Sequence, residues 1–236
     1  MLLRGAVALT YHAVDDVGGV VSFADDPHRL VTSPEHLRAH IRLLRRLGYE
    51  FVTASAFAAD RKPGSRVAAL TFDDGFAGWV THALPVLEQE RVAATFYLCP
   101  GWWEHQHPDV AGRAGRLLAA RDVARLVDAG MAVGSHAWDH PDLRGVGDVE
   151  LERQVGDSRR AIEELTGLPC DTFAYPFGLY DDRVADAVAA AGYDLAWGWV
   201  PGPWRRFAAP RLAAPPRHGS GRLLAKLAGL RRFWTV

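Results

Sequence analysis

The chain has 236 residues, of which 49% are hydrophobic and 23% charged, and its formal net charge is −1. This length and composition predict one globular domain with a full apolar core, and they exclude a disordered chain. No apolar run approaches the roughly 20 residues that span a bilayer. Cys99 and Cys170 are the only cysteines and form no CxxC pattern, which excludes a disulfide framework and a thiolate metal site.

Basic residues gather at the C-terminal end. No Asp or Glu follows Asp194, whereas residues 205–236 contain eight arginines and lysines. This basic C-terminal segment also carries Leu223, Leu227 and Leu230 at helical spacing. The pattern predicts either peripheral membrane contact through an amphipathic helix or docking of the same apolar face on the core. Nucleic acid is not an expected partner.

The first ten residues do not read as a secretory signal, because Arg4 interrupts an apolar stretch that is too short for one. They predict a first buried strand instead. With neither a signal peptide nor a transmembrane segment, the expected location is the cytoplasm, where the basic C-terminal segment can contact the inner face of the membrane.

Six short apolar runs are typical of buried parallel strands. They are residues 7–11, 66–72, 92–98, 131–134, 172–175 and 193–197. Helical patterns lie between them. One begins at the Ser33 cap with Pro34 as its first residue and ends before Gly48; others run from about Asp148 to Thr166 and from Asp181 or Asp182 to Gly192. Alternating strands and helices predict a parallel α/β sheet, either closed into a barrel or open and doubly wound.

The polar residues favour the barrel. His12, Asp73, Asp74, His136 and the segment 175–178 follow the C-terminal ends of different predicted strands. In a barrel these ends meet on one face, whereas an open sheet would spread them along a crevice.

Two motifs together indicate metal-assisted hydrolysis. Asp73-Asp74-Gly75 places adjacent carboxylates at a strand end, and His136 and His140 stand four residues apart, a spacing that faces both rings the same way on a helical turn. One carboxylate and two imidazoles suit zinc or another first-row divalent ion, and the second carboxylate is left to act as a base. Spacing alone does not say which Asp has which role.

The chain resembles the polysaccharide deacetylases, the fourth carbohydrate esterase family, which share the NodB homology domain. Three motifs in order carry the resemblance: Thr71-Phe-Asp-Asp-Gly75, the His136-x-x-x-His140 pair, and Phe173-Ala-Tyr-Pro-Phe-Gly178. The resemblance implies a distorted (β/α)7-type TIM-like barrel that fills residues 1–236 as one domain. It also implies hydrolytic removal of N-acetyl groups from an N-acetylated amino sugar in a glycan or glycoconjugate.

The resemblance assigns roles to these residues. Asp73 is the expected general base, and Asp74, His136 and His140 are the expected ligands of a divalent metal, with Zn favoured over Co, Ni, Fe or Mn. The backbone at Tyr175, Pro176 and Phe177 is expected to bind substrate, with the Phe177 amide in the oxyanion site.

Two departures from the family pattern stand near this site. Ala137 replaces the Ser or Thr that usually follows the first histidine. Ala174 replaces an arginine that orients the catalytic Asp in many members, so another group must hold Asp73. Without such a group, the chain would be a carbohydrate-binding pseudoenzyme on the same fold; a third alternative is a hydrolase of another N-acyl amide.

The general acid has two candidates. Many family members take it from a histidine after the last strand, where this chain offers His218 in no recognisable strand. His12 instead ends the predicted strand 7–11, as the Leu-x-His motif of the family would. The chain thus resembles a circularly permuted branch with His12 as the acid.

Aromatic residues are frequent near the expected site. Trp102, Trp103 and Trp138 are candidates for stacking on a sugar ring, although core or loop packing is the alternative for each. His105 and His107, in the same loop as Trp102, are expected to be solvated.

Overall fold

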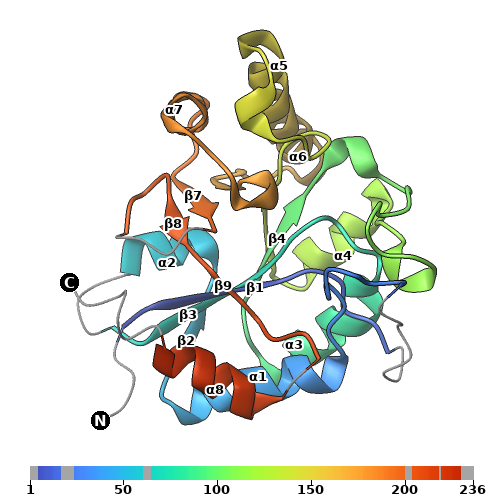
Figure 1. The fold of residues 1–236 in the computed structure, drawn as a ribbon, viewed down its shortest axis with the longest axis vertical. Helices are drawn as coiled ribbons and strands as arrows, with labels where there is room; N and C mark the ends of the chain where they lie inside the picture. The colour runs from blue at the N-terminus through green and yellow to red at the C-terminus, as the bar shows by residue number, and fades with distance from the viewer. Residues whose placement is uncertain (1–4, 17–23, 61–64, 200–203, 218, 230–236) are drawn as a thin grey trace.

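The computed structural model describes residues 5–16, 24–60, 65–199, 204–217 and 219–229. A parallel sheet in the order β8-β7-β6-β5-β4-β3-β1-β9 forms the centre, and helices cover its outer side (Figure 1). The strands are β1 Val7–Tyr11, β2 Glu50–Val52, β3 Val67–Phe72, β4 Thr95–Leu98, β5 Ala132–Ser135, β6 Thr172–Ala174, β7 Leu195–Gly198, β8 Ala209–Pro210 and β9 Leu212–Ala213. All six predicted strands are present, whereas the short β2, β8 and β9 left no readable pattern.

The sheet closes through one short segment near the C-terminus. β8 pairs with β7, β9 pairs with β1, and only Arg211 separates β8 from β9. The segment therefore joins the two ends of the sheet into a nearly closed barrel. The expected TIM-like barrel is confirmed, and the open doubly wound sheet is excluded.

β3 lies at the centre of the arrangement that positions the site. β3 pairs with all of β1 through residues 68–72, while β2 pairs with the beginning of β3 and β4 with its end. Both β1 and β3 are buried along their entire length, which explains their uninterrupted apolar sequences. The residues that follow β3 consequently emerge between the ends of β1 and β4.

Helix boundaries follow the predicted caps. Ser33 caps α1, with its Oγ accepting from the His36 N–H at 3.2 Å, and Asp181 caps α7 through the Val184 N–H at 2.9 Å. The predicted helix from Asp148 is interrupted by a π-helical turn, η6, which the sequence pattern did not reveal. The helices are α1 Pro34–Arg46, α2 Ala54–Asp60, α3 Leu84–Glu90, α4 Val123–Asp128, α5 Asp148–Glu152, η6 Arg153–Asp157, α6 Ser158–Thr166, α7 Asp182–Ala190 and α8 Ser220–Gly229, with a further π-helical turn η1 at Trp79–Ala83.

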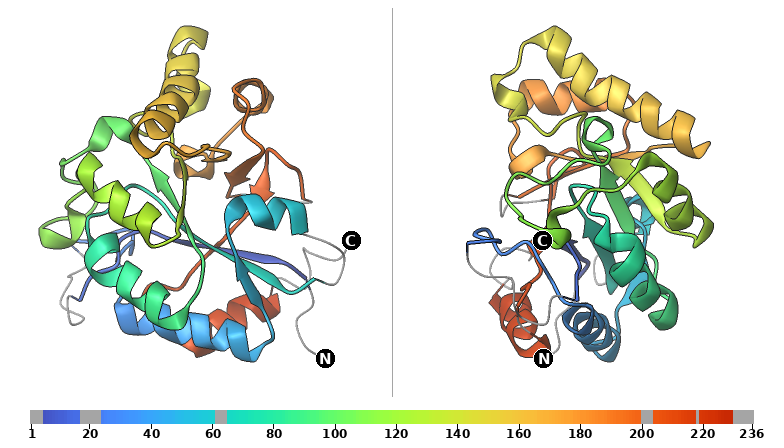
Figure 2. Two further views of the ribbon diagram at one scale, coloured as in Figure 1. Left: turned by 180° about the vertical axis from the view of Figure 1, so that it is seen from behind. Right: turned by 90° about the vertical axis from the view of Figure 1, so that its right-hand side faces the viewer.

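The described part of the basic C-terminal segment belongs to the barrel. After β8 and β9 it forms α8, which lies beside α1 (Figures 1 and 2). Leu223 and Leu227 on α8 are buried in the core, so docking accounts for the apolar face. Membrane contact gains no support from these residues, and Leu230 lies outside the described ones. No helix in the described ranges is long and apolar enough to cross a bilayer.

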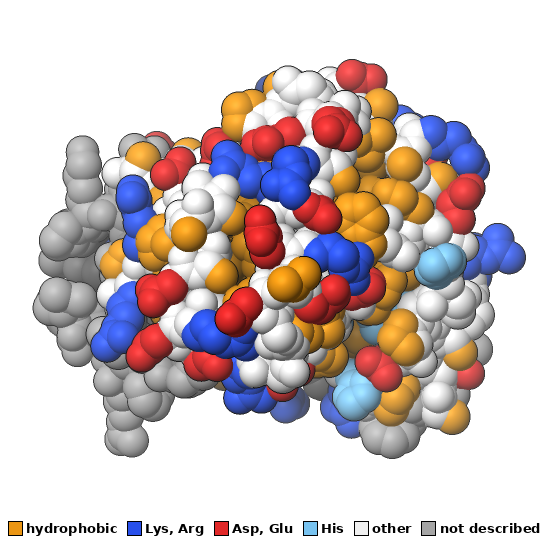
Figure 3. Space-filling model, turned by 90° about the horizontal axis from the view of Figure 1, so that it is seen from above, with side chains coloured by type: hydrophobic (Ala, Val, Ile, Leu, Met, Phe, Trp, Pro, Cys, Tyr) orange, Lys and Arg blue, Asp and Glu red, His pale blue; other side chains and the backbone are white. Residues whose placement is uncertain are grey.

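Surface charge is mixed on the side that carries α5 and α7. In Figure 3, acidic and basic side chains of the described residues are interspersed across this side, with apolar patches between them. The uneven charge along the sequence does not become a single-sign field on this face.

Candidate active site

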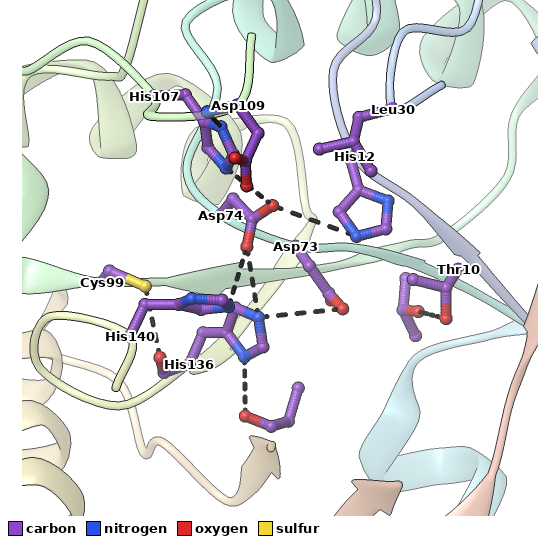
Figure 4. A network of polar contacts seen from close by, with 12 residues as sticks. Thr10, His12, Leu30, Asp73, Asp74, Cys99, His107, Asp109, His136 and His140 are labelled. Atoms are coloured by element: carbon purple, nitrogen blue, oxygen red, sulfur yellow. Dashed lines mark hydrogen bonds and ion pairs between the residues drawn. The ribbon is translucent and has the colours of Figure 1, made fainter. Parts of the chain in front are cut away.

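A strained turn after β3 separates the two adjacent carboxylates. Asp74 has a φ of 82° and Gly75 one of 80°; a positive φ is costly for any residue with a side chain, and such conformations concentrate at functional sites. Both carboxylates are buried, with residue exposures of 3% for Asp73 and 4% for Asp74. The turn gives them different neighbours, as Figure 4 shows.

Asp74 faces two imidazole nitrogens. Its Oδ1 lies 3.2 Å from His136 Nε2 and 3.5 Å from His140 Nε2, and one ligand atom from each of the three residues lies within 4.8 Å of the others. Buried Oδ1 has no hydrogen-bond partner among the described residues. Three ligands at about 2.1 Å from one tetrahedral ion would be roughly 3.4 Å apart, so these separations fit a divalent metal.

The ring nitrogens are placed for the same ion. His136 Nδ1 lies 2.6 Å from the Ala174 carbonyl; because a carbonyl only accepts, Nδ1 carries a proton and Nε2 is the atom left for the ion. Although burial acts to lower it, the Asp73 and Asp74 carboxylates raise the pKa of His136, so a metal would bind in place of a proton on Nε2. Burial lowers the pKa of His140 to about 3, so that ring is neutral. Asp74 Oδ1 and the two Nε2 atoms thus form a donor set that fits a divalent cation.

The two histidines do not lie on a helical turn, which corrects the expectation from their spacing. They follow β5 in a loop where Ala137 and His140 both have positive φ. Gln154, on the π-helical turn η6, is fully buried, and its Oε1 accepts from the Trp138 and Asp139 N–H groups at 2.9 and 3.2 Å. This side chain holds the loop, so the π-helical turn serves the site.

Arg211 is the group that holds Asp73, in place of the arginine that is missing at Ala174. Its Nη1 and Nη2 donate to Asp73 Oδ1 and Oδ2 at 2.8 and 2.7 Å, and Nη1 also donates to Thr71 Oγ1 at 3.0 Å. The pair is buried, with Arg211 only 7% exposed. Burial alone would raise the pKa of Asp73, but the Arg211 guanidinium, together with His136 and His12, outweighs burial and the pKa is lowered. Asp73 is thus an oriented, ionised carboxylate.

No pattern in the sequence predicts this role of Arg211. It stands between the two-residue strands β8 and β9, which have no readable periodicity, and it looked like one more charge in the basic C-terminal segment. The barrel brings it to the end of β3, 138 residues earlier in the chain.

His12 extends from the end of β1 to the same centre. Its Nε2 lies 3.9 Å from Asp74 Oδ2, and its side chain is 20% exposed. Burial lowers the pKa of His12, although Asp74 and Asp73 act in the opposite direction. His218 lies outside the described residues.

His107 is a part of the site that the sequence analysis missed. It was expected to be solvated, but it is 4% exposed and its Nε2 lies 3.3 Å from Asp74 Oδ2. The Asp109 N–H donates to its Nδ1 at 3.1 Å, so in the neutral ring the proton is on Nε2 and points to Asp74. Stacking on Phe76, with ring centroids 4.8 Å apart, fixes the imidazole. His105, in contrast, is exposed as expected.

Comparison with known proteins places this centre in a family. The family model described as polysaccharide deacetylase matches residues 60–196, more than half of the chain. The chain belongs to the polysaccharide deacetylase family. Solved structures share the fold: a polysaccharide deacetylase from Bacillus cereus (24% identity, TM-score 0.78, 95% of this chain and 69% of that one) and the deacetylase PplD from Streptococcus pyogenes (21% identity, TM-score 0.79, 94% and 98%).

Curated relatives carry more specific names. The peptidoglycan-N-acetylglucosamine deacetylase PgdA of Listeria monocytogenes is 33% identical over 54% of this chain and 24% of its own length. A chitooligosaccharide deacetylase of Sinorhizobium fredii is 31% identical over 61% of this chain and 62% of its own length. The chain spans at most about three fifths of the length of these and the other first-ranking relatives.

The third deacetylase motif lies beside the His pair. Phe177 follows β6 with a φ of 56°, and its ring centroid is 4.5 Å from that of His140. The Tyr175 side chain is buried instead, and its hydroxyl donates to the Phe207 carbonyl at 3.0 Å. Pro176 is buried too. The motif can therefore offer the site its backbone and the Phe177 ring, but not the Tyr175 hydroxyl.

The three candidate tryptophans differ in their surroundings. Trp102 lies next to the His pair, with its ring centroid 5.1 Å from that of His140. Trp138 is half-buried between Gly101 and the Arg153 guanidinium, which lies 5.7 Å from the ring centroid. Trp103 is half-buried and packs on the core. Trp102 is the best placed of the three for contact with a substrate.

Proposed function

We propose that the chain is a metal-dependent hydrolase that removes N-acetyl groups from an N-acetylated amino sugar in a glycan or glycoconjugate. One observation carries the proposal: an oriented carboxylate, Asp73, stands beside three groups, Asp74, His136 and His140, whose spacing fits one divalent ion. The names of the curated relatives support the amino-sugar substrate.

Each group has a separate task in this reaction. A divalent ion, with zinc expected from the nitrogen and oxygen ligands, would supply a Lewis acid that polarises the acetamide carbonyl. Asp73 takes a proton from water as the water oxygen adds to the carbonyl carbon. The C–N bond then breaks, acetate leaves, and the amine nitrogen receives a proton. Arg211 holds Asp73 in place but touches no reacting atom.

His12 is the proposed donor of that last proton. It stands opposite the His pair across Asp74 (Figure 4), and it is the candidate on a strand end, as the circularly permuted arrangement requires. The Phe177 backbone N–H is proposed to stabilise the oxyanion, because the Phe177 ring already contacts His140.

The main argument for the carbohydrate-binding alternative no longer applies. It was motivated by the missing arginine at Ala174, and Arg211 now makes the bidentate pair with Asp73. Cytoplasmic location and membrane contact through the basic C-terminal segment remain proposals to be tested by fractionation of cells that express the chain.

The decisive experiment measures acetate release from N-acetylglucosamine oligomers by zinc-reconstituted protein. Asp73→Asn is expected to lower kcat by about 10²- to 10⁴-fold, the usual contribution of a general base, while zinc is still bound. Full turnover by Asp73→Asn would exclude the proposed mechanism. A parallel panel of non-sugar N-acetyl amides tests the other alternative, and turnover of those amides alone would reassign the substrate class.

A further inference from the structure

A cavity adjoins the proposed active site on the side of His12. It has a volume of about 290 Å³ and lies between the end of β1, residues 28–30, Thr32, Trp199 and, in the C-terminal segment, residues 213–217, Arg222 and Lys226. This size is close to the lower end of known small-ligand pockets. His12 lines the cavity and also lies 3.9 Å from Asp74, so a ligand there would be a neighbour of the group that undergoes reaction.

The cavity is lined by positive charge. Arg29, Arg217, Arg222 and Lys226 belong to its wall, and the described residues that line it include no Asp or Glu. These four side chains come from two distant parts of the sequence, which the docking of α8 brings together. Three of the eight basic residues that follow Asp194 thus line the cavity.

One buried carboxylate near the cavity is already engaged. Asp26 is fully buried; it accepts from the Leu30 and Val31 N–H groups at 2.6 and 3.1 Å and pairs with Arg217 Nη2 at 3.0 Å. The structure pairs neither Arg222 nor Lys226 with a carboxylate among the described residues. The pair with Asp26 therefore orients Arg217 and leaves the wall with a net positive charge.

Lys226 is partly buried, and a hydrogen bond holds its ammonium group at the cavity. Its Nζ donates to the Ala213 carbonyl at 2.8 Å. Burial, together with the nearby Arg222 guanidinium, lowers the pKa of Lys226. The two cationic side chains repel each other, and an anion between them would relieve the repulsion.

We propose that this cavity is a subsite for an anionic group of the substrate, a carboxylate or a phosphate carried next to the N-acetylated sugar. The proposal rests on the deacetylase function, which it narrows to acidic glycans or glycosyl phosphates. Trp199, 45% exposed at the rim, supplies an apolar face for the adjoining sugar ring.

The test compares two ligands that carry an anionic group next to N-acetylglucosamine with one ligand that carries none. Binding to the Asp73→Asn protein is measured calorimetrically for three ligands: N-acetylglucosamine 1-phosphate, N-acetylglucosamine linked to glucuronic acid, and a neutral N-acetylglucosamine dimer. At least one anionic ligand is expected to bind ten-fold or more tightly than the dimer, and the better of the two identifies the source of the charge. Equal affinity for all three ligands would overturn the proposal.

Variants connect the preference to the cavity. Arg222→Gln and the double variant Arg222→Gln, Lys226→Gln are expected to reduce the preference to within about three-fold, with the neutral dimer as the internal reference. Arg125→Gln, an exposed arginine on α4, is the matched control and should keep the preference. Because Arg222 is exposed, the single variant Arg222→Gln is expected to fold. It keeps the test valid if the double variant is unstable. A preference unchanged in both variants would overturn the proposal.

This outcome is separable from that of the proposed function. Acetate release from neutral oligomers tests deacetylation without involving the cavity. A protein that deacetylates neutral and anionic substrates equally would retain the function and lose the subsite. A protein that binds anionic sugars tightly but releases acetate from none of them would retain the subsite and lose the function.

Discussion

Asp73 and Asp74 are adjacent and chemically identical, yet their surroundings differ, as the proposed division of roles requires. Asp73 pairs with a guanidinium, whereas Asp74 faces the Nε2 atoms of two imidazoles. The motif predicted that the roles differ, and the family resemblance predicted which residue has which role. The group that orients Asp73 could not be predicted, because the pairing depends on barrel closure rather than on any local pattern.

Replacement of Arg211 tests this division of roles. Without the guanidinium, the largest of the charges that oppose burial is lost, and the pKa of Asp73 is expected to rise. A protonated carboxyl cannot accept a proton from water, so the acid limb of the profile of kcat/KM against pH is expected to move to higher pH in Arg211→Met. Activity at neutral pH should fall by at least ten-fold, and Arg211→Lys should recover part of it.

Stability is the necessary control for that variant, because removal of one partner of a buried ion pair costs about 3–5 kcal/mol. Urea unfolding monitors the loss, and the exposed Arg206→Met should change neither stability nor the pH profile. A profile with an unshifted acid limb in folded Arg211→Met would show that Arg211 does not tune Asp73.

His107 provides the second prediction at this scale. It donates to the Asp74 oxygen that lies away from His136 and His140, and groups that orient a metal ligand typically contribute 10- to 100-fold to metal affinity. His107→Phe is therefore expected to weaken zinc binding by about that factor in a chelator competition assay. His107→Gln, which can still donate to Asp74, should bind zinc more tightly than His107→Phe does.

The matched control for His107 is His105→Phe, an exposed histidine on the same loop, which should bind zinc like the unmodified chain. Equal zinc affinity in His107→Phe and His105→Phe would mean that His107 serves packing alone.

At the scale of elements, the strands and capped helices were predictable because burial and capping are local. The HxxxH spacing was misleading, since the same spacing occurs in a loop when Ala137 and His140 adopt positive φ. A buried side chain on η6, Gln154, supports that loop from another part of the chain. Contacts of this kind depend on packing and leave no periodic signal in the sequence.

Helix α8 allows a direct comparison between neighbouring leucines. Leu223 is fully buried, whereas Leu224 is 42% exposed. Leu223→Ala is expected to lower the free energy of unfolding by about 2–5 kcal/mol, as for other buried leucines. Leu224→Ala should cost much less, and urea unfolding measures both. Similar losses in the two variants would mean that α8 does not dock as described.

At the scale of the whole molecule, a metal that binds only the folded chain should stabilise it. Free zinc at about 1,000 times its dissociation constant is expected to add roughly 4 kcal/mol to the free energy of unfolding, visible as a higher Tm that chelation reverses. Asp74→Asn should lose most of this increment. An equal increment in Asp74→Asn would place the ion elsewhere.

Barrel closure ties the orientation of Asp73 to the last strands of the chain. β1, β3 and every ligand of the proposed metal precede β8 and β9, whereas the guanidinium that pairs with Asp73 stands between β8 and β9. A chain shortened before β8 would still contain all three proposed metal ligands but not the partner of the proposed base. In the proposed mechanism, hydrolysis therefore depends on a complete barrel, and turnover itself would report that the barrel is closed.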